Sequence, residues 1–230
     1  MTDFKPYYLE KGQGQPLLLL HGNAESSAFF HSQIEYFSCD YRVIAPDTRG
    51  HGRSARGSKP LDLLQCAEDL RLFLDDLGIA KAHLLGFSDG GNIALLFALK
   101  YPQYIDRLVL NGANLYPNGL KWHVLMLIYL EFGLFSLLSA VNKRFLLRKE
   151  IVQLMVNQPN IPGEALSALL MPTLVIAGDR DMISDAHTRA IASNIKNSRL
   201  LILPGDHFLA KKSPELFNGH VAAFLRGDAH

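Results

Sequence analysis

The chain has 230 residues, of which 48% are apolar, so it can form one domain with a substantial core, and a disordered chain is excluded. Its formal net charge is +1, which gives no reason to expect nucleic acid or an acidic membrane surface as a partner. The two cysteines, Cys39 and Cys66, form no metal-ligand cluster. We expect two buried thiols, no disulfide framework, no bound metal and a reducing, cytoplasmic location.

Short apolar runs recur along the chain, and each ends at glycine, proline or a polar residue. They cover residues 17–20, 42–45, 83–86, 108–110, 173–177 and 200–203. Because these runs are continuous rather than alternating, they predict strands that are buried on both faces of a parallel sheet. Residues 7–10 are expected to add an antiparallel hairpin strand, turned at Gly12-Gln13-Gly14.

Helical patterns separate these strands, so the sequence predicts an α/β domain. The predicted helices cover residues 26–37, 61–77, 92–99, 184–195 and 214–225. The alternation stops between residues 114 and 170, where two or three helices are expected as an insertion on the same domain.

One segment of the insertion, residues 122–141, is long and apolar enough to span a bilayer. Glu131 lies at its middle, where an acidic group costs about 2.5–3.5 kcal/mol on insertion scales. A membrane span is therefore not expected.

The clearest chemical motif is Gly86-Phe87-Ser88-Asp89-Gly90, which follows a predicted strand and opens a predicted helix. In that context the G-x-S-x-G spacing is typical of a sharp turn that exposes a nucleophilic serine. The small elbow residues Gly86 and Gly90 allow the strand and the helix to approach each other closely. Ser88 is therefore the candidate nucleophile.

A serine hydroxyl needs a base, and the base needs an orienting carboxylate. His207 follows the last predicted strand, and Asp181 follows the one before it, so both are expected at the same sheet edge as Ser88. Asp179 is expected to cap the turn or to pair with Arg180.

The other histidines are assigned different places. His21 is expected to be structural, and His123, inside the insertion, is a candidate for binding substrate. His31, His187, His220 and His230 lie on predicted helices or the tail and are expected to be solvated.

A tetrahedral intermediate would need hydrogen-bond donors for its oxyanion. The backbone N–H of Asp89, at a helix start, and that of Asn23, in the loop after residue 20, are the candidates. The mechanism needs neither a metal nor a cofactor.

Taken together, the motifs resemble those of the α/β-hydrolase superfamily over nearly the full chain. The matching pieces are His21-Gly22, residues 47–54, the serine elbow, residues 178–181 and residues 205–208. The resemblance implies one domain over residues 1–230, a mostly parallel central sheet flanked by helices, and a short helical cap at about residues 114–170, inserted after the sixth strand.

The elbow Ser88-Asp89-Gly90-Gly91 is similar to that of valacyclovir hydrolase-like esterases. The resemblance implies that Asp89 receives a substrate ammonium group. The alternative, which we prefer, is a first-turn carboxylate favoured by the helix dipole by about 0.3–1 kcal/mol.

The expected function is that of a serine carboxylesterase that cleaves a small-molecule ester through an acyl-enzyme. Alternatives are hydrolysis of a lysophospholipid, a monoacylglycerol or a carbon–carbon bond, and a non-catalytic ligand receptor. The apolar residues of the segment 122–141 are expected to roof a pocket over Ser88; docking on lipid or on a second subunit is the rival interpretation. The sequence leaves the oligomeric state open.

Overall fold

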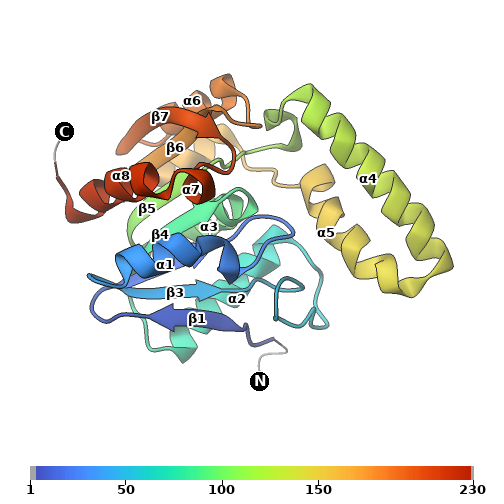
Figure 1. Ribbon diagram of the computed structural model, residues 1–230, viewed down its shortest axis with the longest axis horizontal. Helices are drawn as coiled ribbons and strands as arrows, with labels where there is room; N and C mark the ends of the chain where they lie inside the picture. Colours follow the sequence, from blue (N-terminus) through green and yellow to red (C-terminus); the bar gives the residue numbers. More distant parts are fainter. Residues whose placement is uncertain (1–3, 229–230) are drawn as a thin grey trace.

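A seven-stranded sheet in the order β1-β3-β2-β4-β5-β6-β7 forms the centre of the computed structural model, which describes residues 4–228 (Figure 1). The strands are β1 (Tyr8–Lys11), β2 (Pro16–Leu20), β3 (Arg42–Pro46), β4 (Ala82–Phe87), β5 (Ile105–Asn111), β6 (Thr173–Arg180) and β7 (Ser198–Asp206). All neighbours are parallel except β1 and β3. The predicted α/β class and the mostly parallel sheet are confirmed.

The partner expected for the first strand is wrong. β1 is antiparallel, but it pairs with β3, with Tyr8 opposite Pro46, and not with β2. The reason is that β2 is already paired on both edges, with β3 and with β4. The outer edge of β3 is therefore the position that remains for β1.

The continuous apolar run of β2 is explained by two cores, one on each face of the sheet. Leu18 and Leu20 pack with the helices on one face, and Leu17 and Leu19 pack on the other. Successive strand side chains point to opposite faces, so a strand covered on both sides has no polar positions.

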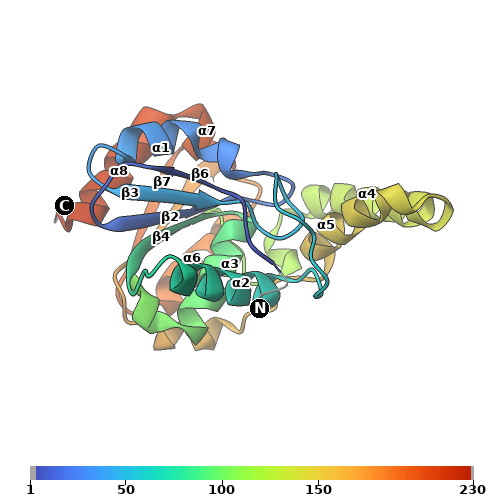
Figure 2. The same ribbon diagram turned by 90° about the horizontal axis from the view of Figure 1, so that it is seen from below.

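Helices form a layer on each face of the sheet (Figures 1 and 2). One layer contains α1 (His31–Phe37), α7 (Leu209–Lys212) and α8 (Pro214–Arg226); the other contains α2 (Leu63–Asp76), α3 (Asp89–Lys100) and α6 (Asp185–Asn194). α2 begins after Asp62, whose side chain accepts a hydrogen bond from the backbone N–H of Gln65.

The insertion consists mainly of α4 (Trp122–Val141) and α5 (Leu146–Asn157), which project together from the side of the domain (Figure 2). The insertion was expected after the sixth strand, but in this chain it lies between β5 and β6 and therefore follows the fifth strand. The count is lower because the chain has one strand, β1, before the first strand of the parallel part of the sheet. Two contacts fix α5 to the domain: Glu150 pairs with Arg56 at 2.8 Å, and the side chain of Asn23 donates to the carbonyl of Ile151 at 2.9 Å.

The apolar roof expected over Ser88 is not formed. α4 is long and apolar enough to cross a membrane by length and composition alone, yet Ile128 is its one buried residue. Leu127, Leu130, Leu134 and Leu137 are exposed. The reason is that α4 packs along α5 and not against the sheet edge (Figure 1).

The two cysteines differ, although both were expected to be buried. Cys66 is buried on α2, whereas Cys39 is exposed in the turn after α1, and both thiols are free. Burial raises the pKa of the Cys66 thiol.

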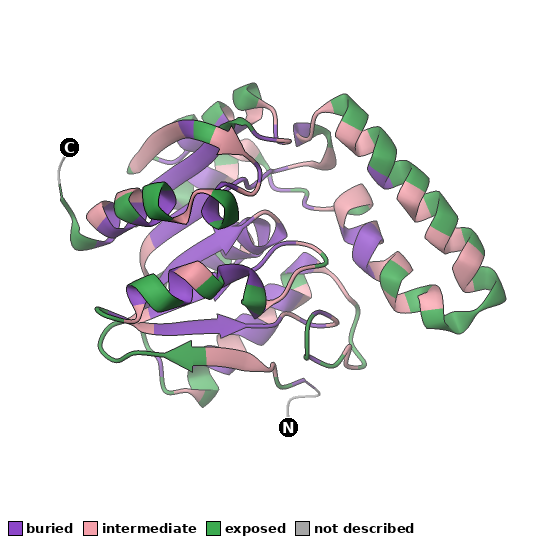
Figure 3. Ribbon diagram, viewed as in Figure 1, coloured by how far each residue is buried: buried purple, intermediate pink, exposed green. Residues whose placement is uncertain are grey.

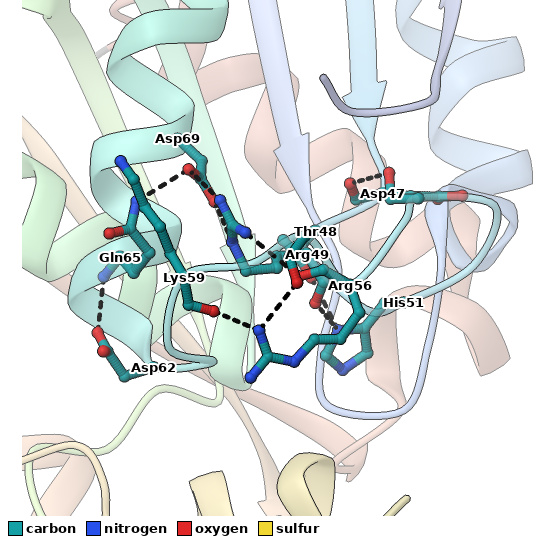
Figure 4. Close-up of polar contacts among 11 residues, drawn as sticks. Asp47, Thr48, Arg49, His51, Arg56, Lys59, Asp62, Gln65 and Asp69 are labelled. Carbon is teal, nitrogen blue, oxygen red and sulfur yellow. Dashed lines mark hydrogen bonds and ion pairs between the residues drawn. The ribbon is translucent and has the colours of Figure 1, made fainter. Parts of the chain in front are cut away.

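A buried ion pair fixes the long loop between β3 and α2 (Figure 4). The Arg49 side chain is fully buried, and its Nε and Nη2 each donate to one oxygen of Asp69 at 2.8 Å. Its Nη1 donates to the carbonyl of Arg56 at 3.2 Å. Asp69 lies on α2, so this pair ties the loop to the helical layer.

Asp69→Asn should destabilise the protein by about 3–5 kcal/mol, because it leaves the Arg49 guanidinium buried without a counter-charge. Urea unfolding measures the change. The matched control is Asp75→Asn on the same helix, where the carboxylate is 42% exposed and pairs with Arg71. That change should cost about 1 kcal/mol or less. Equal losses in both variants would contradict the role given to the buried pair.

Candidate active site

Ser88 lies at the turn between β4 and α3, in a backbone conformation that only a constrained turn maintains. Its φ is 53° and its ψ is −121°, a backbone conformation that residues other than glycine rarely adopt. The N–H of Ser88 donates to the carbonyl of Asn111 at the end of β5 (2.8 Å), and its own carbonyl accepts from Gly91 and Asn92. These bonds hold the strained turn in place.

The two elbow glycines leave no space for a side chain. A Cβ on Gly86 would lie 2.3 Å from the carbonyl oxygen of Gly90. A Cβ on Gly90 would lie 2.0 Å from the carbonyl oxygen of Leu20 on the neighbouring strand. Strand, turn and helix can pack this closely only because both positions are glycine.

The structure brings Ser88, His207 and Asp181 together. The Nε2 of His207 lies 3.0 Å from Ser88 Oγ, and its Nδ1 lies 2.7 Å from Asp181 Oδ1. Since a carboxylate can only accept, Nδ1 carries the hydrogen and the Nε2 lone pair faces the serine hydroxyl. His207 and Asp181 are 4% and 3% exposed, so water does not compete for this contact. The arrangement can remove a proton from Ser88.

Local contacts orient both partners of the serine. Asp181 Oδ1 also accepts from the backbone N–H of Ile183 at 2.9 Å. The His207 ring packs against Phe87, with ring centroids 4.9 Å apart. Asp179, as expected, stabilises the adjoining turn: it accepts from the N–H of Gly205 at 2.9 Å and pairs with Arg180.

The loop that carries Asn23 passes beside the serine. A Cβ on the preceding residue, Gly22, would lie 3.1 Å from Ser88 Cβ. Ala24 turns the loop with a φ of 56°. This path brings Asn23 close to the first residue of α3, Asp89, so both backbone amides remain candidates for the oxyanion donors.

Asp89 belongs to a buried polar network. Its two carboxylate oxygens accept hydrogen bonds from the side chains of Asn23 (2.9 Å) and Asn92 (3.1 Å). Asn92 also bonds with the side chain and the backbone N–H of Asn114. Burial raises the pKa of Asp89, and the hydrogen bond from Asn23 is the largest effect that opposes this increase.

The network has little room for a ligand. The cavity that Asp89 lines together with His21, Asn23 and His51 has a volume of about 10 Å³, enough for about one water molecule. A substrate ammonium group beside Asp89 therefore remains a prediction that this arrangement does not favour. Asn92 and Asn114 were not identified from the sequence as members of this network. The available signal was the amide side chain of Asn92 near the start of an otherwise apolar helix.

A larger hollow adjoins His207. Its volume is about 280 Å³, and its lining includes His207, His123, Lys121, Arg180 and Lys212. His123, the candidate for binding substrate, therefore lines a hollow together with His207, and its contact with substrate stays a prediction. The hollow is open, and its lining carries more positive than negative charge.

The remaining histidines have structural contacts or surface positions. His21 is buried, burial lowers its pKa to about 4, and its Nε2 accepts from the N–H of Thr48 at 3.0 Å. His187 was expected to be solvated, but its Nε2 accepts from the N–H of Leu115 at 2.8 Å. That bond links residues far apart in sequence, so no local pattern could indicate it. His31 is exposed and His220 half-buried. His230 lies outside the described residues.

Comparison with known proteins places these features in a family. The family model for the alpha/beta hydrolase fold matches residues 15–154. The 2-hydroxy-6-oxononadienedioate/2-hydroxy-6-oxononatrienedioate hydrolase of Burkholderia vietnamiensis is 31% identical over 98% of this chain and 92% of its own length. The 3-oxoadipate enol-lactonase 2 of Acinetobacter baylyi is 26% identical over 95% and 92%. A thermophilic esterase from Thermogutta terrifontis superposes with a TM-score of 0.78 at 25% identity, over 97% and 94% of the two chains.

Gly90→Ala should destabilise the protein by about 3 kcal/mol and disrupt the turn at Ser88, because the added Cβ would overlap the Leu20 carbonyl. Thermal and urea unfolding measure the loss. Gly219→Ala, on α8 with open space around its Cβ position, is the control and should stabilise by about 0.5–1 kcal/mol. A Gly90→Ala protein as stable as the parent would contradict the packing account.

Proposed function

The chain belongs to the α/β-hydrolase fold family and is a hydrolase of that fold, and on this premise we propose that it is a serine hydrolase that cleaves a small carboxylic ester. The observation that carries the proposal is the continuous contact from Ser88 Oγ to His207 at 3.0 Å and from His207 to Asp181 at 2.7 Å. Catalysis by such a triad needs a serine hydroxyl in contact with a base, and a buried carboxylate that fixes the tautomer of that base.

In the proposed reaction, His207 Nε2 takes the hydroxyl proton as Ser88 Oγ attacks the ester carbonyl. Asp181 stabilises the imidazolium that forms. The backbone N–H groups of Asn23 and Asp89 would stabilise the oxyanion. His207 then donates its proton to the leaving alcohol, which produces an acyl-enzyme. Water, activated by the same base, releases the acid and restores Ser88.

A second candidate reaction is the cleavage of a carbon–carbon bond in an acidic substrate. Its support is the hollow beside His207, whose lining holds Lys121, Arg180 and Lys212 against the carboxylates of Asp181 and Asp206. Arg180 pairs with Asp179 and Lys212 pairs with Asp206, so Lys121 is the cation that this lining has in excess. The name of the Burkholderia vietnamiensis relative describes a dicarboxylate substrate, and one carboxylate of such a substrate would suit Lys121. Hydrolysis of a lysophospholipid or a monoacylglycerol, a receptor role and the cytoplasmic location stay predictions.

Ser88→Ala should reduce p-nitrophenyl acetate turnover by roughly 10⁴-fold or more, because it removes the nucleophile while the fold is kept. Initial rates measure the loss. Ser193→Ala, at an exposed position on α6, is the matched control and should keep parental activity. Parental turnover by Ser88→Ala would contradict the assignment. An inactive parent that is stabilised against heat by a ligand would favour the receptor alternative.

The two candidate reactions are separated by substrate charge. If the hollow receives a substrate carboxylate, Lys121→Gln should raise KM for 2-hydroxy-6-oxononadienedioate roughly fivefold, because one cation near a carboxylate contributes about 1 kcal/mol. The KM for the neutral ester should stay unchanged. Lys196→Gln, outside the hollow, is the control. Hydrolysis of the neutral ester alone, with no turnover of the dicarboxylate, would exclude the second reaction.

A further inference from the structure

The outer side of α4 is an apolar surface that the rest of the described chain leaves uncovered (Figure 3). Eight of the thirteen exposed large hydrophobic side chains among the described residues lie on this helix. They include Trp122 (75% exposed), Leu130 (65%), Leu137 (73%) and Val141 (90%). We call the exposed side of residues 122–141 the outer face of α4. Monomeric soluble proteins seldom expose so continuous an apolar surface without a binding role.

The outer face carries no charged side chain. Glu131, at the border with the inner side, pairs with Arg148 of α5 at 3.0 Å. The polar groups among the exposed side chains of α4 are the imidazole of His123, the phenol of Tyr129 and the indole N–H of Trp122, and none of them is a carboxylate. The 20 residues of α4 make a helix about 30 Å long. The face is therefore long, apolar and free of carboxylates.

The position of α5 argues against α4 as a membrane span. α5 returns along α4 after a short connection, and it carries Arg148, Lys149 and Glu150. Glu150 is paired with Arg56 of the domain, so α5 is held at the domain surface. For α4 to cross a bilayer, this charged and anchored helix would have to cross back. A surface that lies parallel to the helix axis can cover the outer face without moving α5.

Cations flank the outer face at both ends. Lys121 precedes α4, and Lys143 and Arg144 follow it. In a two-fold dimer built on α4, a parallel pairing would bring Lys143 and Arg144 onto their own copies, and an antiparallel pairing would bring Lys121 onto them. Both pairings place like charges together. Anionic lipid headgroups complement all three cations at once.

We propose that the outer face of α4 docks the protein on a lipid bilayer that contains anionic phospholipids. The helix lies in the plane of the interface, with its leucines among the upper acyl chains and its flanking cations at the headgroups. Trp122 and Tyr129 then lie at the depth that aromatic side chains favour. His123 and Val124, on the first turn, line the hollow beside His207, so docking brings that opening to the lipid surface.

The protein contains its own reporter, because Trp122 is the single tryptophan of the chain. Its emission is recorded on titration with vesicles of phosphatidylcholine and phosphatidylglycerol, and with vesicles of phosphatidylcholine alone. Sedimentation with the vesicles gives the partition coefficient. The expected result is a blue shift and co-sedimentation with the anionic vesicles, weakened by added salt.

Two double variants test the two halves of the surface. Leu130→Glu with Leu137→Glu should lower the partition coefficient by roughly tenfold or more, because two apolar side chains no longer enter the acyl boundary. Lys143→Glu with Arg144→Glu should lower it roughly fivefold for each cation removed on anionic vesicles. Leu64→Glu, an exposed position on α2 (49%), is the control and should bind as the parent does. Unchanged thermal unfolding verifies that each variant is folded.

Absence of both the blue shift and co-sedimentation would overturn the proposal. A dimer found by light scattering would also overturn it, if Trp122 emission is already blue-shifted without lipid and the double variant Leu130→Glu with Leu137→Glu is a monomer. A second copy of the chain would then cover the outer face of α4. Bound protein that resists extraction by high salt and alkaline carbonate would mean insertion across the bilayer, which also contradicts docking at the interface.

Discussion

The structure depends on the close contact of β4, the turn at Ser88 and α3. Gly86 and Gly90 bring the backbone of strand and helix so near that a Cβ at either position would overlap a carbonyl oxygen. This contact forces Ser88 into a φ of 53° and raises its hydroxyl above the carboxyl edge of the sheet. The strain is local, and the dense packing of the two apolar cores offsets it. A serine elsewhere on the sheet would lack this orientation.

The same sheet edge positions everything that faces the serine. β6 and β7 end side by side, so Asp181 and His207 meet there although 26 residues separate them. The loop after β2 is held by a second set of contacts, in which Asn23 bridges Asp89 at the elbow and the Ile151 carbonyl of α5. Through Asn23 the inserted helices and the elbow are tied to each other. The buried polar side chains of Asn23 and Asp89 thus hold the loop, the elbow and α5 in place around Ser88.

Much of this arrangement follows from local patterns in the sequence. Apolar runs that end in polar residues identify the strands and the edge at which Ser88, Asp181 and His207 gather. The pairing of β1 could not be predicted, because it depends on which strand has a free edge. The position of α4 could not be predicted either. Its residues are apolar all round, so no periodicity indicates which side packs, and burial depends on α5. The hydrogen bonds of Asp89 with Asn23 and of His187 with Leu115 could not be predicted either, because each joins residues that lie far apart in the sequence.

The identity of the nucleophile is the central claim, and covalent labelling tests it most directly. A fluorophosphonate probe reacts with an activated serine, and peptide mass spectrometry of the labelled protein locates the adduct. The account predicts one adduct, on Ser88, whose formation is lost when His207 is replaced by glutamine. An adduct on another residue, or an unlabelled protein that still hydrolyses esters, would contradict it.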